Sequence, residues 1–268
     1  MNDERLTDRQ TWNEVYRTRE SVCVPFVEGH WREYASTQAL QHLQALGLAG
    51  RRVLEVGGGD STFLTFLARK YPDARFSALD YSSEGCERLR ARAGRESVSV
   101  AVHEMDLFDP APSLLHSFDV VYSLGVVEHF NDLPAVLAAK KRLLAPGGRM
   151  FSLIPNLSSP LLRWLMRRWS PEVYDLHVPH DWRSFLGAHA AAGLSVVEHG
   201  YVGSTEFGML SIAADRLDDT RRADRLTYLW LTRLSKAAHL FECRAFDLPT
   251  SRLLSPFMYA VGQNETSH

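Results

Sequence analysis

The chain has 268 residues, of which 45% are hydrophobic, and this is enough to bury the core of a single α/β domain. Its 30 Lys and Arg residues nearly balance 32 Asp and Glu residues, and a formal charge of −2 excludes a field that would attract nucleic acid or an anionic membrane without specificity. The three cysteines, Cys23, Cys86 and Cys243, lie far apart without CxxC spacing, so we expect unpaired thiols in a reducing cytoplasm.

The N-terminal region is expected to be helical. Residues 10–16 and 31–46 have the spacing of amphipathic helices, with Tyr34, Leu40 and Leu43 among the apolar positions of the second. The N-terminus is charged from its third residue onward and no apolar segment of a secretory signal follows it, which predicts a cytoplasmic protein. We expect residues 1–48 to form a helical cover over the sheet edge or over a bound cofactor.

Residues 49–156 alternate between apolar runs of strand length and segments of helical period. This alternation is typical of βαβ units with a parallel sheet. The run Pro146-Gly147-Gly148 is expected to stop the last helix. The expected strands are 52–56, 75–79, 99–104, 118–123 and 149–154, and the expected helices are 62–71, 84–93 and 133–144.

The remaining elements complete the fold. A helix over 182–192, with Asp181 as N-cap and Gly193 as stop, leads into a strand at 195–198, and the final strand is expected at 256–262. The long connection between these strands includes a helical stretch near 227–241. We therefore predict one domain over 1–268, a doubly wound, mostly parallel seven-stranded Rossmann-like sheet with an antiparallel last strand. Its helical insertions at 157–182 and 204–255 are expected on the substrate side.

A glycine-rich turn follows the first strand directly. The segment Glu55-Val56-Gly57-Gly58-Gly59-Asp60-Ser61 lies at the carboxyl end of a parallel strand, where open α/β sheets bind ligands. Glycine lets backbone approach a cofactor closely, and the helix that follows offers free N–H groups. Asp80 ends the second strand, where an acidic residue meets ribose hydroxyls in nucleotide-binding folds, although it could also cap the next helix.

Five segments in this order make the chain similar to the class I S-adenosylmethionine-dependent methyltransferases that act on small molecules. They are VLEVGGGDS, ALDYS, MDLFD, FDVVYSLGVVEHF and LLAPGGRMFSLIPN. The resemblance implies S-adenosylmethionine as cofactor, with S-adenosylhomocysteine as product. It departs from the family pattern at Ser61, which replaces the third glycine.

The resemblance also implies roles for individual residues. Glu55 and the turn glycines would hold the methionine part of the cofactor, and Asp80 and Tyr81 would contact its nucleoside. Asp106 and Leu107 would contact the adenine, and the end of the fourth strand at Leu124 would pass the reactive region. The expected cofactor residues are Glu55, Gly57, Gly58, Gly59, Asp80, Tyr81, Asp106, Leu107 and Leu124.

Two other functions remain open from the sequence. A nicotinamide-dependent oxidoreductase also uses glycines after its first strand, but its GxGxxG pattern would place a glycine where this chain has Thr62. A protein that binds S-adenosylmethionine and catalyses a reaction other than methylation would share every motif named above. Analysis of products with a methyl-labelled cofactor separates these alternatives.

The acceptor side has several candidate residues. His129 follows the fourth strand, and His177 and His180 lie in the polar and aromatic segment 174–182, so these histidines are the candidate general bases. Structural roles for them are equally open. Pro179 argues against a helical pair of histidine ligands, so we expect no metal site. The candidate substrate residues are Tyr34, Asn156, Tyr174 and Trp182.

The expected partner is a small-molecule acceptor, whose methylated atom could be oxygen, nitrogen or carbon. Nucleic acid is not expected, because no basic stripe is visible, and neither is stable membrane association. The amphipathic segment 157–169 contains Leu, Trp and Met with three arginines, and we interpret it as a pocket lid. Exposed aromatic helices leave a homodimer open as an alternative.

Overall fold

One mixed sheet organises the chain. In the computed structural model, which describes residues 5–18, 26–210 and 222–265, seven strands pair in the order β3-β2-β1-β4-β5-β7-β6, and only β7 runs antiparallel to its neighbours. The predicted fold class is therefore confirmed. The strands are β1 (Arg52–Val56), β2 (Arg75–Asp80), β3 (Val100–Glu104), β4 (Phe118–Leu124), β5 (Leu144–Pro155), β6 (Ser195–Val202) and β7 (Phe257–Gln263).

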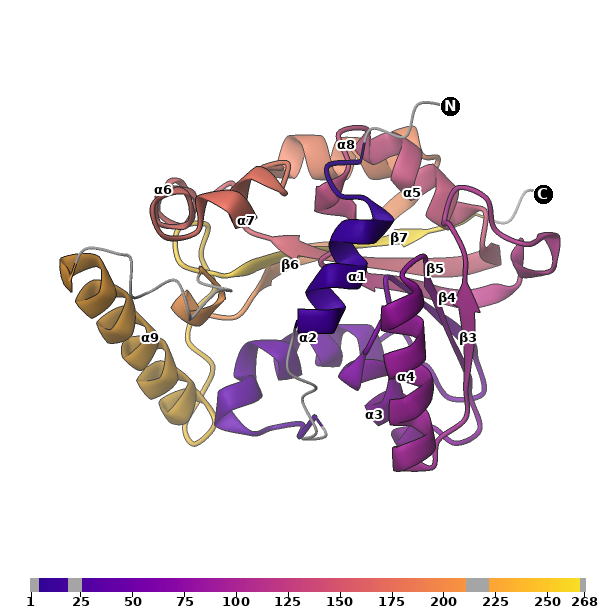
Figure 1. Ribbon diagram of the computed structural model, residues 1–268, viewed down its shortest axis with the longest axis horizontal. Coiled ribbons are helices and arrows are strands. Elements are labelled where there is room, and N and C mark those ends of the chain that lie inside the picture. Colours follow the sequence, from indigo (N-terminus) through magenta and orange to yellow (C-terminus); the bar gives the residue numbers. More distant parts are fainter. Residues whose placement is uncertain (1–4, 19–25, 211–221, 266–268) are drawn as a thin grey trace.

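Helices cover both faces of this sheet (Figure 1). One buried cluster joins α5 and α8 to β4 and β5, and a second joins α2, α3 and α4 to the opposite face. The helices are α1 (Arg9–Thr18), α2 (Tyr34–Gln44), α3 (Thr62–Lys70), α4 (Ser83–Glu96), α5 (Leu133–Lys141), α6 (Pro160–Trp169), α7 (Pro171–Asp175), α8 (Trp182–Ala191) and α9 (Arg222–Glu242). Four short 3-10 helices lie between them: η1 (Trp31–Glu33), η2 (Pro112–Leu114), η3 (Val127–His129) and η4 (Phe207–Leu210).

Side-chain caps begin the helices that follow the strands. Ser61 accepts a hydrogen bond from the Leu64 backbone N–H at the start of α3, and Ser82 does the same for Gly85 at the start of α4. The Asp181 cap predicted for α8 is confirmed as part of a reciprocal capping box with Ser184. These caps fix the first turn of each helix above the carboxyl end of the preceding strand.

The expected boundary between the fifth helix and the fifth strand was wrong. The helix ends at Lys141 instead of residue 144, and the strand begins at Leu144 instead of residue 149. Leu144 pairs with Phe118 and is fully buried, so pairing and packing on β4 outweigh the helical pattern at this position. The Pro146-Gly147-Gly148 run therefore lies inside the strand region and does not end a helix.

The two insertions pack against each other beyond the sheet. Helix α6, η4 and part of α9 share a third apolar cluster that includes Trp169, Phe207 and Leu210. The outer side of α9 stays exposed at Trp230 and Leu234, and α9 lies apart from the sheet in Figure 1. The 157–169 segment expected as a lid is helical from Pro160.

The expectations about membrane association and about the cysteines can be compared with the described residues only. Within the described residues, no helix has the length and apolar content needed to cross a membrane. Cys86 and Cys243 are both free thiols, whereas Cys23 lies outside the described residues.

Candidate functional site

The glycine turn lies where β1 meets α3. Gly57 has a φ of 74°, and a Cβ built on it would come within 2.4 Å of the Val126 side chain. A Cβ on Gly58 would lie 3.0 Å from Ala78, and one on Gly59 would lie 2.8 Å from Asp80 Oδ2. The three glycines therefore let this backbone pass between β2 and the loop that follows β4.

Asp80 reaches across from the end of β2 to the same turn. Its Oδ2 accepts a hydrogen bond from the Gly59 backbone N–H at 2.8 Å, and its Oδ1 accepts one from Ser82 at 2.8 Å. Burial raises the pKa of this carboxyl, and these backbone donors oppose the rise. Ser82, not Asp80, caps α4. Tyr16 of α1 lies with its hydroxyl 3.5 Å from Asp80 Oδ2, so α1 covers the carboxylate.

The position after the glycines has a role that the sequence did not reveal. Asp60 has a φ of 53°, a left-handed conformation that costs free energy for a residue with a Cβ. The buried Arg92 of α4 holds its carboxylate through Nη2 at 2.7 Å, and Arg88 lies 3.7 Å away. An ion pair from α4 thus stabilises the turn at Asp60. The next residue, Ser61, is the position at which the family pattern has its third glycine.

Glu55 lies beneath the turn in β1 and is 4% exposed. Its Oε2 accepts a hydrogen bond from the Tyr122 hydroxyl at 2.8 Å. Burial is the largest cause of a pKa raised to about 7, and the nearby Asp80 raises the pKa further while hydrogen bonds from Ser61 and Tyr122 lower it. A carboxyl that changes charge near neutral pH is suited to binding a cationic group.

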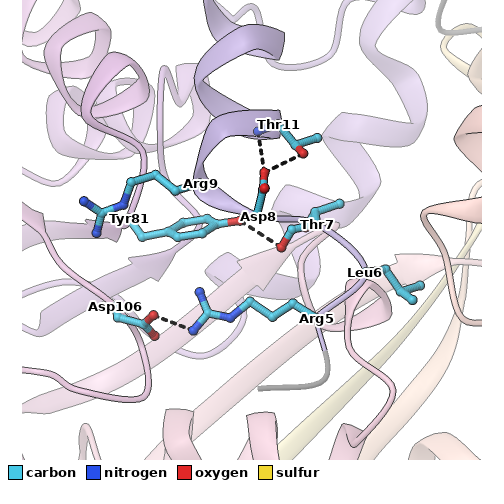
Figure 2. Close-up of a pocket in the computed structure, with 8 residues that line it drawn as sticks. All are labelled: Arg5, Leu6, Thr7, Asp8, Arg9, Thr11, Tyr81 and Asp106. Carbon is cyan, nitrogen blue, oxygen red and sulfur yellow. Dashed lines mark hydrogen bonds and ion pairs between the residues drawn. The ribbon is translucent and has the colours of Figure 1, made fainter. Parts of the chain in front are cut away.

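The expected adenine residues face an arginine from the N-terminal segment (Figure 2). Arg5 forms an ion pair with Asp106, and its guanidinium lies 5.1 Å from the centre of the Tyr81 ring and 5.4 Å from that of Phe108. A cavity of about 460 Å³ adjoins this cluster, lined by residues 5–9, Thr11, Tyr81 and Asp106. A planar cation therefore lies beside Asp106, which the resemblance assigns to the adenine, and Tyr81, which it assigns to the nucleoside, so an adenine bound there requires Arg5 to move.

Leu107 lies in the segment that follows β3, and Leu124 is the last residue of β4. Leu107 is 7% exposed and packs in the cluster beneath α5, and Leu124 is partly exposed at the last position of β4. Glu55 and Asp80 likewise lie at or next to the last residues of β1 and β2, and Asp106 follows β3. The structure thus brings the expected cofactor residues to one edge.

A buried polar cluster follows β4. Glu128 and His129 end η3, and the His129 and His177 ring centres lie 4.7 Å apart. Burial lowers the pKa of His129 to about 4 and raises the pKa of Glu128 to about 8. The N-terminal segment reaches this cluster too, because the Leu6 backbone N–H donates to the His129 carbonyl at 2.8 Å. The loops after β4 and α7 therefore meet beneath the N-terminal segment.

His180 does not join the other two histidines. It is 6% exposed, and its Nε2 has no hydrogen-bond partner among the described residues. It lines a separate cavity of about 430 Å³ with Ser158, Arg163 and Arg252 at the carboxyl end of β5. The three candidate bases thus divide between two places.

Three of the four expected substrate residues make hydrogen bonds within the fold. The Tyr34 hydroxyl donates to Asp247 at 2.7 Å, and Asn156 Nδ2 donates to the carbonyls of Arg252 and Ser255, both at 2.9 Å. Trp182 Nε1 donates to the Tyr201 hydroxyl at 2.8 Å. These bonds tie α2 and β5 to the second insertion and α8 to β6.

Tyr174 lies in α7, next to the His177 loop. It is partly exposed and the Arg167 guanidinium lies 5.4 Å from the centre of its ring. A substrate role for Tyr34, Asn156, Tyr174 and Trp182 stays a prediction. The residues missed by the sequence reasoning were Arg5, Tyr16 and Arg92, because nothing in their local pattern marks which distant group they contact.

Comparisons with known proteins identify the family and the fold. Residues 29–199 match the methyltransferase domain family. A ubiquinone biosynthesis O-methyltransferase from Sodalis glossinidius is 30% identical over 143 residues, which are 52% of this chain and 56% of that protein. The chain therefore spans about half the length of the curated relatives that it matches.

Solved structures share the fold at low sequence identity. The [4+2]-cyclase SpnF superposes with a TM-score of 0.59 at 16% identity, covering 85% of this chain and 80% of SpnF. Geranyl diphosphate C-methyltransferase from Streptomyces coelicolor, solved with S-adenosylhomocysteine, superposes with a TM-score of 0.57 at 15% identity, covering 85% and 76% of the two chains. At these identities the likeness concerns the fold alone, so the chemistry has to be argued from the residues.

Proposed function

The chain belongs to the methyltransferase domain family, in its class I S-adenosylmethionine-dependent fold, and from this premise we propose that it transfers a methyl group from S-adenosylmethionine to a small-molecule acceptor. The observation that carries the proposal is the meeting of Glu55 and Asp80 at the glycine turn, where the Gly59 N–H donates to Asp80 Oδ2 at 2.8 Å. Two buried carboxylates at this edge fit a ligand that carries both an ammonium and vicinal hydroxyls. The family match and the S-adenosylhomocysteine bound to a structural neighbour support the same cofactor.

Each part of the cofactor has proposed contacts. Glu55 would take the ammonium of the methionine part above Gly57 and Gly58, and Asp80 would accept hydrogen bonds from the ribose hydroxyls beside Gly59. Tyr81, Asp106 and Leu107 would contact the adenine once Arg5 has moved, and Leu124 would lie beside the reactive methyl. The sulfonium supplies the electrophilic methyl group, and the chain's own residues position it and exclude water.

We propose a hydroxyl oxygen as the methyl acceptor. A relative is named as an O-methyltransferase, and the paired rings of His129 and His177 lie in the loops after β4 and α7, where burial lowers the pKa of both imidazoles. These two histidines would face the acceptor hydroxyl, while His180 would line the second cavity. Tyr174 of α7 and the 157–182 and 204–255 insertions would enclose the acceptor, within one domain that spans residues 1–268.

A radiolabel experiment tests the function. The purified chain is incubated with methyl-labelled S-adenosylmethionine and a panel of phenols, amines and activated carbon acids, and both products are quantified. We expect labelled phenol ether and S-adenosylhomocysteine in equal amounts. Rearrangement of an acceptor without S-adenosylhomocysteine would instead support a non-methylating enzyme, and binding of NAD alone would support an oxidoreductase. Either result would overturn the proposal.

The pKa of Glu55 predicts a pH dependence of cofactor affinity. Because its pKa is about 7, Glu55 is mostly protonated at pH 5.5 and half ionised at pH 7. Only the ionised carboxylate attracts the ammonium of the cofactor, so we expect the affinity to rise about 15-fold between these pH values. Calorimetric titration in two buffers of different ionisation enthalpy measures both this rise and the proton released on binding. Glu55→Gln should remove the pH dependence, and an unchanged affinity in the wild-type chain would contradict the assignment.

A further inference from the structure

The polar cluster after β4 combines three side chains that can each bind a metal ion. Glu128, His129 and His177 each offer one ligand atom, and these three atoms lie within 4.8 Å of one another. Two of the residues come from η3 and the third from the loop after α7. The Val178 backbone N–H donates to the Glu128 carbonyl at 2.7 Å, which holds the two segments together.

The hydrogen bonds of both histidines leave the same ring atom without a proton. His129 Nδ1 lies 2.6 Å from the Leu176 carbonyl oxygen, and His177 Nδ1 lies 2.6 Å from the Val173 carbonyl oxygen. A carbonyl only accepts, so each Nδ1 carries the hydrogen and each Nε2 of the neutral ring has a free lone pair. Metal-binding histidines are commonly oriented in this way, with the second nitrogen donating to a backbone carbonyl.

Glu128 adds a carboxylate that the surrounding protein does not satisfy. Its side chain is 2% exposed, and Oε2 has no hydrogen-bond partner among the described residues. The fully buried Lys140, whose charge lowers the pKa of Glu128, directs its hydrogen bonds elsewhere, to Ser123 Oγ at 2.7 Å and to Ser152 Oγ at 2.8 Å. A buried carboxylate oxygen without a donor is costly, and a bound cation would remove that cost.

We propose that Glu128, His129 and His177 bind a divalent transition-metal ion, with zinc as the best fit. Two imidazole nitrogens and one carboxylate are a common ligand set for zinc, and they leave a fourth position open. Tetrahedral bonds of about 2.1 Å bring ligand atoms to about 3.4 Å from one another, so side-chain rotation has to shorten separations that are now within 4.8 Å by at most about 1.4 Å. This proposal differs from the expectation of no metal site, which rested on the absence of CxxC spacing and on Pro179 between His177 and His180.

A fourth ligand of the ion would lie beside His129 and His177, the residues proposed to face the acceptor. The Leu6 N–H to His129 bond places the N-terminal segment against the cluster, and Trp12 of α1 packs edge-on against His129 with ring centres 5.3 Å apart. A hydroxyl bound to the ion would have its pKa lowered and would release its proton to solvent before attack on the methyl group. This use of the ion rests on the proposed function, whereas binding of the ion does not.

Cobalt titration tests the site without cofactor or acceptor. The chain is treated with a chelator, dialysed and titrated with Co²⁺, whose visible absorption reports coordination by nitrogen and oxygen, and zinc competition gives the affinity of Zn²⁺ itself. We expect one equivalent of Co²⁺ that Zn²⁺ displaces. His177→Ala and Glu128→Gln should each weaken binding at least about 100-fold, because a three-ligand site loses one ligand. His199→Ala, which removes an exposed imidazole outside the cluster, should bind Co²⁺ as the wild type does.

The outcomes separate this site from the proposed function. Circular dichroism and thermal unfolding of each variant show whether it is folded, and His177→Gln provides a second variant of similar size. Absence of Co²⁺ and Zn²⁺ binding at micromolar concentration in the wild type would overturn the inference. Unchanged binding in His177→Ala, His177→Gln and Glu128→Gln would overturn it as well. Neither result would affect methyl transfer measured with labelled cofactor, which tests the proposed function by itself.

Discussion

Asp80→Ala is expected to weaken binding of S-adenosylmethionine by about 100-fold or more. The substitution removes a buried carboxylate that lies at the carboxyl end of β2, in hydrogen-bond contact with the glycine turn. Two ribose hydroxyls would lose a charged acceptor, and hydrogen bonds to charged groups contribute about 1.5–3 kcal/mol each. Isothermal titration calorimetry with S-adenosylmethionine and S-adenosylhomocysteine measures the loss directly.

Controls separate this effect from damage to the turn. Asp80→Asn keeps the size of the side chain and one of the two acceptor oxygens that the Gly59 and Ser82 N–H groups use, so it should remain folded while it binds the cofactor more weakly than the wild type. Glu104→Ala removes an exposed carboxylate that pairs in register with Asp80 on β3, and it should leave the affinity unchanged. Wild-type affinity in a folded Asp80→Ala variant would show that the ribose is bound elsewhere.

Gly57→Ala is expected to lower the free energy of unfolding by about 3 kcal/mol. The φ of 74° disfavours any residue with a Cβ by about 1–2 kcal/mol. The new Cβ would also lie 2.4 Å from Val126 Cγ2, and relief of such overpacking typically costs about 1–3 kcal/mol more. Urea unfolding followed by circular dichroism measures the difference between the variant and the wild type.

A second glycine provides a matched control for this prediction. Gly47 has the same φ of 74°, but a Cβ built on it meets no atom within 4 Å. Gly47→Ala should therefore show the backbone effect alone, and the difference between the two variants isolates the contact with Val126. If both variants lose the same stability, the close approach of the turn to the loop after β4 is not rigid, and the proposed shape of the cofactor site is wrong.

The strands of the sheet could be predicted closely because their signal is local. The expected strand at 52–56 matches β1, and those near 75–79 and 118–123 each extend by one residue. Runs of buried apolar residues between turn signals mark parallel strands whatever their partners are. The boundary between α5 and β5 failed because Leu143 and Leu144 suit either element, and only contact with β4 decides between them.

The residues on the cofactor side of the candidate site could also be predicted from the sequence. Glu55, the glycines and Asp80 lie at strand ends, and the carboxyl ends of parallel strands meet at one edge of a sheet. The grouping of residues on the acceptor side could not be predicted in this way. His177 and His180 are close in sequence, yet the structure places His177 against His129 and turns His180 into another cavity.

The sequence by itself determined the type and order of the elements, the glycine turn and the position of its acidic partners, because these depend on periodicity and on residues within one strand or helix. Tertiary structure alone decided that Arg5 meets Asp106 across 101 residues, that Arg92 supports Asp60 and that His177 joins Glu128 and His129. Apolar patterning specifies which face of each element is buried, but it does not specify which loops then meet. Polar partners across such loops are selected by packing geometry and by the cost of leaving a buried donor or acceptor unpaired.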